Sequence, residues 1–136
     1  MEFDTKIALV VRKDLETWQK LNVTAFLTSG IVGATENIIG ENYKDANGHA
    51  YNPLVIQPMM IFEATADQLT RTLRRAKDRE VKSSVFIEDM FTTAHDEANR
   101  QVVSQYSSEL LPLVGVSMRS NKKTIDKIIK GLKLHH

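Results

Sequence analysis

The sequence contains no cysteine, which excludes a disulfide framework, a thiol nucleophile and a thiolate metal site. Its 136 residues also lack any apolar run near the roughly 20 residues that a membrane-spanning helix needs. The first apolar run follows Glu2 and Asp4 closely and is too short for a secretory signal peptide. We therefore expect a cytoplasmic protein that does not associate with membranes.

The sequence also lacks an excess of charge of either sign, since 18 basic and 17 acidic residues leave a net charge of +1. This balance argues neither for nor against a polyanionic partner. Two segments are nevertheless rich in basic residues, and the plainest interpretation is that each is the solvated face of a helix. A phosphate-binding face is the alternative. The residues are Arg71, Arg74, Arg75, Lys77 and Arg79, and Lys122, Lys123, Lys127, Lys130 and Lys133.

Length and composition favour one folded domain. A hydrophobic content of 42% and a charged content of 26% are ordinary for a globular protein, and 136 residues can bury a core without metal or disulfide support. We expect the domain to span residues 1–134. We interpret His135–His136 as the remnant of an expression tag.

The N-terminal region predicts a buried strand followed by a helix. Ile7–Val11 is a short, continuous run rich in β-branched residues, which is typical of a strand buried on both faces. Asp14 is placed to cap the helix that follows. The apolar positions that we expect to form the buried stripe of this helix are Leu15, Trp18, Leu21, Ala25 and Val32.

The middle of the chain predicts a hairpin, a strand and a helix. Residues 40–53 are dense in turn formers, and Asn47-Gly48 is a strong hairpin signal. Residues 54–62 are expected to form a strand that lies at an edge or is interrupted at Pro58, which cannot donate to a ladder. Thr65 and Gln68 have capping-box spacing and open a helix to about Arg79.

The last part of the chain predicts two strands, each followed by a helix. Residues 83–89 form the first strand, which reaches the sheet through a helix and so favours a parallel βαβ unit with a right-handed crossover. Thr93 and Asp96 have capping-box spacing before a polar helix at 94–106. Residues 111–118 form the next strand, and Ser120 or Asn121 caps a helix. The apolar face of that helix is Ile125, Ile128, Ile129 and Leu132.

This element order predicts a single three-layer α/β/α domain with a small mixed, mainly four-stranded sheet. Binding sites in such sheets lie beyond the carboxyl ends of strands. Two polar segments occupy such positions, Arg12–Asp14 and Glu88–Thr93. We therefore expect these two segments to form one polar site.

The same segments resemble those of the type II peptidyl-tRNA hydrolases. Residues 7–15, Ile-Ala-Leu-Val-Val-Arg-Lys-Asp-Leu, are similar to that family's first strand and Arg-x-Asp-Leu turn. Residues 86–93 resemble a strand that ends in Asp-x-x-x-Thr, and residues 115–134 resemble the family's last strand and C-terminal helix. Lys20 falls near the lysine that begins the family's first helix. The resemblance implies the hydrolase fold.

One segment departs from the hydrolase pattern. That family has Lys-Ile-Ala-Ala-Gln followed by a histidine, whereas residues 20–26 of this chain contain neither glutamine nor histidine. The combination Trp18-Gln-Lys-Leu-Asn-Val23 is instead similar to an uncharacterised bacterial family, domain of unknown function 2000, which is thought to share the hydrolase fold. We interpret this family as the closer match.

If the resemblance extends to activity, the catalytic residues are Lys20, Asp89 and Thr93. Ester hydrolysis needs a polarised carbonyl, an oriented water and a cation for phosphate or the developing oxyanion. Lys20 would supply the cation, Asp89 would orient Lys20 or accept a proton, and Thr93 would position water. Neither a cofactor nor a metal is expected, because the histidine and carboxylate spacing does not match a metal site.

Five further residues are candidates for binding. Arg12 has a fork that suits two phosphate oxygens, and it is grouped with Asp14, Asn22, Thr92 and His95. Asn22 is expected to be half-buried and in need of partners, and His95 is a candidate proton carrier.

Each candidate residue also has a purely structural interpretation. Thr93 can cap a helix, Asp89 can accept from turn amides, and Lys20 can be an ordinary surface lysine. Trp18 can simply pack. Two functions therefore stay open. One is hydrolysis of a peptidyl- or aminoacyl-tRNA ester, or of a smaller acyl ester. The other is non-catalytic binding of a small anionic ligand or a protein partner. A homodimer that covers the strand edge near Pro58 is expected by analogy with the hydrolases.

Overall fold

Strand β1 (Thr5–Arg12) is the central strand of a mixed sheet in the computed structural model, which describes residues 2–136. The order of the sheet is β5-β6-β1-β4-β7, with β1 parallel to β4 and antiparallel to β6. The other strands of the sheet are β4 (Met59–Ala64), β5 (Ser84–Ile87), β6 (Leu113–Asn121) and β7 (Lys133–Leu134). The mixed sheet is confirmed, with the two-residue β7 as a fifth strand that the sequence did not predict.

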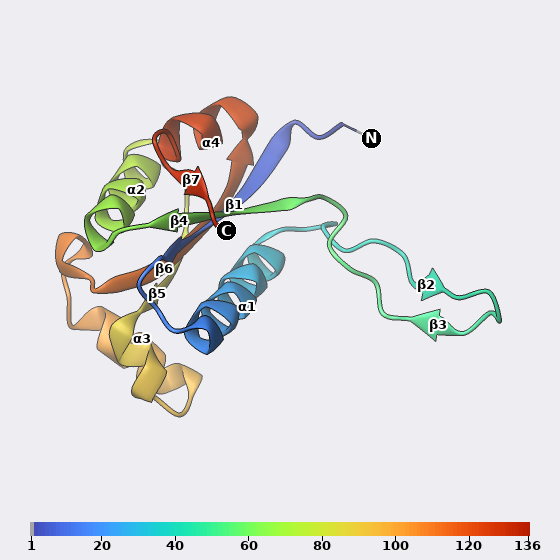
Figure 1. Ribbon diagram of the computed structural model, residues 1–136, viewed down its shortest axis with the longest axis horizontal. Helices are drawn as coiled ribbons and strands as arrows, with labels where there is room; N and C mark the ends of the chain where they lie inside the picture. The colour runs from blue at the N-terminus through green and yellow to red at the C-terminus, as the bar shows by residue number, and fades with distance from the viewer. Residues whose placement is uncertain (1) are drawn as a thin grey trace.

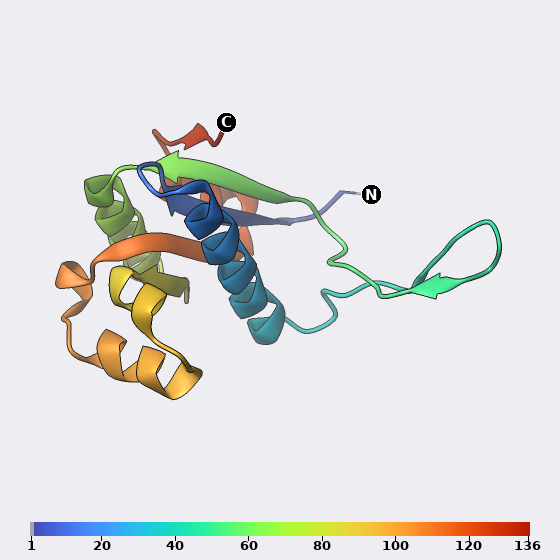
Figure 2. The ribbon, with the colours of Figure 1, turned by 60° about the horizontal axis from the view of Figure 1, so that its bottom comes forward.

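Helices cover both faces of this sheet, so the three-layer prediction is confirmed (Figures 1 and 2). The helices are α1 (Thr17–Ala34), α2 (Ala66–Asp78), α3 (Asp96–Ser104) and α4 (Lys122–Ile128), with short 3₁₀ turns η1 (Glu88–Thr92) and η2 (Ser108–Leu110). Side chains of a strand alternate between the faces. Ile7, Leu9 and Val11 therefore pack under α1, whereas Ala8 and Val10 pack under α2 and α4. None of the helices that the structure describes is long and apolar enough to cross a bilayer.

The predicted parallel arrangement of β4, α2 and β5 is confirmed, but the two strands are not neighbours in the sheet. The two strands run in the same direction, but β1 and β6 lie between them. The antiparallel strand β6 pairs directly with β1, and β5 pairs with β6 at the edge of the sheet. The chain therefore crosses two strands through α2 instead of joining neighbours.

The buried stripe predicted for α1 is wrong. The helix buries Val23, Leu27 and Ile31, whereas Trp18 and Leu21 are 61% and 66% exposed. The first helical residue is also later than predicted, because Glu16 takes the cap position in place of Asp14. Apolar residues occur around most of the circumference of this helix, so spacing alone does not select the face that meets the sheet.

Caps and turns account for most of the remaining boundaries. The capping box of Thr65 and Gln68 opens α2, and Asn121 caps α4, as predicted. Helix α3 is capped by His95 and not by Thr93. Helix α4 ends at Ile128, earlier than predicted, because Gly131 has a φ of +91° and turns the chain back along β4.

The predicted hairpin forms the end of an arm, residues 38–56, that extends away from the sheet (Figure 1). Strands β2 (Tyr43–Lys44) and β3 (Ala50–Tyr51) pair across a five-residue turn in which Gly48 has a φ of +85°. Pro58 directly precedes β4, so the strand begins at Met59 and not at residue 54 as predicted.

Two glycines distinguish a packed position from an open one. A Cβ on Gly115 of β6 would lie 2.6 Å from Val23 Cγ1 and 2.8 Å from Leu27 Cδ1, whereas a Cβ on Gly33 of α1 meets nothing within 4 Å. We expect Gly115→Ala to lower the free energy of unfolding by about 1–3 kcal/mol through overpacking. Gly33→Ala should raise it by up to about 1 kcal/mol through helix propensity. Urea denaturation measures both. Equal effects of the two substitutions would contradict the packing of α1 on β6.

Candidate functional site

A pocket of about 480 Å³ lies where α1 approaches the end of β5, η1 and the start of α3, and we call it the aromatic pocket. Its apolar wall includes four aromatic rings from two segments that are distant in sequence, α1 and the contiguous stretch of β5 and η1. Its polar side chains come mainly from the residues before and within α3. The residues that line it include Trp18, Asn22, Phe26, Phe86, Phe91, Thr93, His95, Asp96 and Asn99.

The four rings of the aromatic pocket are in contact in a continuous chain. The ring centroids of Trp18 and Phe91 are 5.9 Å apart, those of Phe91 and Phe86 are 5.1 Å apart, and those of Phe86 and Phe26 are 5.8 Å apart. The Trp18–Phe91 pair is edge-on, an arrangement that the ring quadrupoles favour. Trp18 and Phe26 are still 61% and 53% exposed, so the rings present apolar surface to the opening of the pocket.

Helix α1 supplies one wall of the pocket through residues four apart. Trp18, Asn22 and Phe26 lie on successive turns and therefore share one flank of the helix. Asn22 is exposed, and not half-buried as the sequence analysis expected. Its amide is thus the polar group in the middle of an otherwise apolar helix flank.

The polar side of the pocket is held by local hydrogen bonds. The hydroxyl of Thr93 contacts Met90 O at 3.0 Å and the side-chain amide of Asn99. The single hydroxyl proton of Thr93 is therefore donated to one of these two protein oxygens. Nδ1 of His95 accepts a bond of 3.2 Å from Ala98 N–H, so this nitrogen carries no proton. Thr93 and His95 therefore shape the loop into α3, with Nε2 of His95 left as its second hydrogen-bonding atom.

The aromatic pocket carries little charge. Among the residues that line it, the only carboxylate is Asp96, which pairs with Arg100, and neither lysine nor arginine lines it. An anionic ligand would therefore find no cation on these walls. The wall chemistry instead suits an uncharged molecule with flat apolar surfaces.

Lys20 lies away from this pocket. It is separated from Asn22 by about 200° around the helix. It lines a different cavity, of about 410 Å³, together with Leu21, Ile61 and His135. The structure therefore does not bring Lys20 to the pocket that Thr93 lines, as the prediction of one shared cleft required.

The two predicted polar segments do meet at the end of the sheet, as an ion-pair cluster. Arg12 Nη1 lies 2.5 Å from Glu88 Oε1, and Arg12 Nε lies 2.6 Å from Asp14 Oδ1. Burial acts to lower the pKa of Arg12, but the hydrogen bonds and charges of Glu88 and Asp14 outweigh it and raise this pKa. The guanidinium, whose side chain is only 16% exposed, is already neutralised by two carboxylates and is not an open phosphate site.

The carboxylate of Asp89 accepts a hydrogen bond from a tyrosine hydroxyl. The hydroxyl of Tyr106 donates to Asp89 Oδ2 at 3.0 Å, and this bond raises the pKa of Tyr106 above its ordinary value. Thr92 donates to the backbone oxygen of Asp89 at 3.0 Å. The Tyr106 bond links η1 to the segment that follows α3, and the Thr92 bond lies within η1. Asp89 thus has a structural contact, although its carboxylate accepts from a tyrosine hydroxyl and not from the turn amides that were the expected alternative.

The sequence did not mark the aromatic residues of the pocket as one site. The spacing of Trp18, Asn22 and Phe26 is a visible helical pattern, Phe91 lies within the polar segment Glu88–Thr93, and Phe86 lies two residues before it. Nothing local indicated that these two segments pack together. Across residues 2–136, the acidic and histidine side chains form no group of three or more that could hold a metal ion.

The fold and the pocket define a three-layer α/β domain with a largely uncharged, aromatic-lined cavity. The chain belongs to the family described as protein of unknown function DUF2000, whose model matches residues 5–136. It is also similar to the solved structure of Atu0240, a protein of unknown function from Agrobacterium tumefaciens. The two are 50% identical, the match covers 99% of this chain and 100% of that chain, and the TM-score is 0.97. A comparison with curated proteins gave no match.

The comparisons confirm the predicted DUF2000 family, and the match of its model extends through His135 and His136. His135 also belongs to the sheet edge, since its N–H donates to Ile61 O at 2.9 Å. The resemblance to peptidyl-tRNA hydrolases is not part of these findings.

The Asp89–Tyr106 bond predicts a measurable titration. In the parent protein, two tyrosines should titrate above their ordinary value because a carboxylate accepts from each neutral phenol, Asp89 for Tyr106 and Asp45 for Tyr51. Asp89→Asn should lower the pKa of Tyr106 alone, as followed by tyrosinate absorbance, and Tyr106→Phe should remove one of the two raised transitions and leave that of Tyr51. Because the folded-state pKa is raised, the stabilisation is present below the ordinary tyrosine pKa and is lost as the pH rises through the folded value. An unchanged titration in Asp89→Asn would contradict this bond.

Proposed function

We propose that this chain is a non-catalytic binding domain and that the aromatic pocket holds an uncharged, planar ring compound. One observation carries the proposal: four aromatic rings in mutual contact line a cavity whose walls have neither lysine nor arginine. The volume of about 480 Å³ suits a small organic molecule.

The polar groups of the pocket define what the ring compound would offer. The Asn22 amide can both donate and accept, and His95 Nε2 is the free nitrogen of a ring whose other nitrogen is engaged. A heteroaromatic ring with both donor and acceptor atoms on its edge complements these groups while its faces contact Trp18 and Phe91. A simple carboxylate or phosphate would have no cation to meet.

Ester hydrolysis is the less favoured function. The three residues that the hydrolase resemblance marks as catalytic are separated or engaged: Lys20 lines another cavity, Asp89 accepts from Tyr106, and the proton of Thr93 is committed. A site for hydrolysis needs its base, its cation and its water-positioning group around one reacting atom. The arrangement of these three residues does not provide that.

The basic segments also lie on the wrong side for a tRNA ester at this pocket. Helices α2 and α4 are neighbours, joined by a 3.3 Å bond from Arg75 Nη1 to Ile128 O, and they cover the face of the sheet opposite to α1 (Figure 2). Phosphate contacts on these helices would hold a nucleic acid on that face. The aromatic pocket borders α1 on the other face.

Binding can be tested through the single tryptophan of the chain. Adenine, benzimidazole and nicotinamide should shift the Trp18 indole N–H and the Asn22 side-chain amide in ¹H–¹⁵N spectra, whereas hexanoate and octanoate should not. Phe91→Leu should weaken the binding about three- to tenfold, because an aromatic contact contributes roughly 0.5–1.5 kcal/mol beyond its area. The matched control is Tyr43→Leu on the arm, which should leave affinity unchanged. A preference for the carboxylates would overturn the proposal.

Hydrolysis can be tested separately. We expect the purified protein to leave labelled peptidyl-tRNA intact at the concentrations at which a type II hydrolase control cleaves it. Lys20→Ala and Asp89→Ala should behave like the parent. Cleavage by the parent that is lost in both variants would establish the hydrolase function instead.

A further inference from the structure

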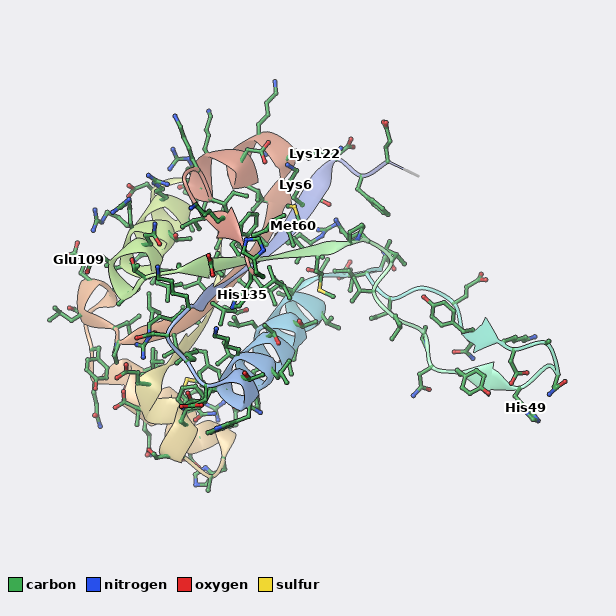
Figure 3. The ribbon with its side chains drawn as sticks, viewed as in Figure 1. Lys6, His49, Met60, Glu109, Lys122 and His135 are labelled. Carbon is green, nitrogen blue, oxygen red and sulfur yellow. The ribbon has the colours of Figure 1, made fainter. Side chains whose placement is uncertain are left out.

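The arm, residues 38–56, packs against the domain at its base, where Ile38 is buried in the α1-side cluster and Val55 contacts that cluster. It extends beyond the helices and the sheet in both ribbon views, and His49 marks its far end in Figure 3. Five large apolar or aromatic side chains on it are 43–63% exposed: Ile39, Tyr43, Tyr51, Leu54 and Ile56. A two-stranded ribbon standing alone in water is only marginally stable. Such a ribbon with apolar side chains is suited to pack against another surface.

The arm is nevertheless well organised internally. At its end, Asp45 accepts from the N–H groups of Asn47 and His49 and from the hydroxyl of Tyr51. This set of bonds, led by the Tyr51 hydroxyl, lowers the pKa of Asp45. At its base, the buried Gln57 accepts from Arg119 Nε at 3.0 Å. The arm therefore has a defined shape before anything covers it.

The surface area of the chain supports a partner. A compact monomer of 15.4 kDa is expected to expose about 7,200 Å². The chain exposes 8909 Å². The excess is about 1,700 Å², whereas a standard stable interface takes only about 800 Å² from each partner. Covering the arm and its receiving surface would thus provide enough area for a stable dimer.

The body of the domain offers an apolar groove that fits the arm. Helix α1 packs over β6, β1 and β5, and the α1 side of β4 is left open. Met59 and Ile61 there are each 38% exposed, and Leu21 of α1 is 66% exposed. Together with the cavity of about 410 Å³ beside Lys20, these residues form what we call the β4 groove.

We propose that the β4 groove of one protomer receives the arm of a second copy of this chain, in a two-fold symmetric dimer. The arm leads into β4 at its base and extends away from α1 and the sheet in Figure 1, so it does not fold back over β4 of its own molecule. Each leg of the arm has about seven residues and spans ~23 Å, close to the ~20 Å of β4. Two identical arm–groove contacts close the assembly.

Removal of the arm is the first test. Sedimentation equilibrium of the full chain should show a dimer at micromolar concentration. Replacing residues 41–53 with Gly-Gly joins two ends that are already paired, since Gly40 N–H donates to Leu54 O at 3.0 Å. This variant should be a monomer with the thermal unfolding of an intact domain. A monomeric parent at 100 μM, or a dimer that persists without the arm, would overturn the proposal.

A charge in the groove is the second test. Leu21→Asp changes an exposed residue and leaves the fold intact, but it should weaken dimerisation by roughly 100-fold because an unpaired charge would be buried. The matched control is Leu110→Asp on η2, where the leucine is 73% exposed and lies outside the groove. Equal effects of the two substitutions would overturn the proposal.

Mixing the two monomeric variants distinguishes arm–groove contact from arm–arm contact. The armless variant keeps its groove, and Leu21→Asp keeps its arm, so the mixture retains one complete contact. We expect a heterodimer, weaker than the parent dimer, that neither variant forms alone. If the arms paired with each other, Leu21→Asp would remain a dimer. That result, or the absence of a heterodimer in the mixture, would overturn the proposal.

Discussion

The burial of β1 on both faces is the constraint on which the rest of the structure depends. Its side chains at positions 7–11 are at most 1% exposed, so every residue of this run needs a covering layer above or below. Alternation sends odd-numbered residues to α1 and even-numbered residues to α2 and α4. The two hydrophobic clusters are thus the two sides of one strand. Strands β6 and β4 pair with it on either edge and shield its backbone polar groups.

The way helix α1 packs on the sheet leaves two apolar flanks of this helix at the protein surface. It buries Val23, Leu27 and Ile31 against the sheet, and its remaining apolar residues stay on the two flanks. One flank, with Trp18 and Phe26, meets the phenylalanines of β5 and η1 and forms the aromatic pocket. The other flank, with Leu21, borders the open side of β4. A helix with apolar residues around most of its circumference leaves apolar flanks uncovered when it packs on a sheet wider than itself. We propose that a ring compound binds at the flank with Trp18 and that the arm of a second copy binds at the flank with Leu21.

Charged residues at the carboxyl ends of β1 and β5 form ion pairs and hydrogen bonds within the protein. The parallel strands β1 and β5 end at the same edge with β6 between them, and the Arg12–Glu88 ion pair spans that interval. The Tyr106–Asp89 bond ties the turn η1 to the segment that follows α3. These contacts hold η1 in place, and η1 carries Phe91 of the pocket. The polar residues that looked catalytic in the sequence thereby position the apolar residues that line the cavity.

The sequence by itself determined the local elements of this protein: the buried first strand, the capping box of α2, the Asn121 cap of α4, the hairpin around Gly48 and the layered α/β class. These follow from interactions between residues close in the chain, so their signals are local. Tertiary structure alone decided which face of α1 is buried, that β6 separates β5 from β1, and that Lys20 and Thr93 lie at different cavities. Each of these depends on docking between segments distant in sequence, where several apolar faces compete and only the packing of the whole domain selects one.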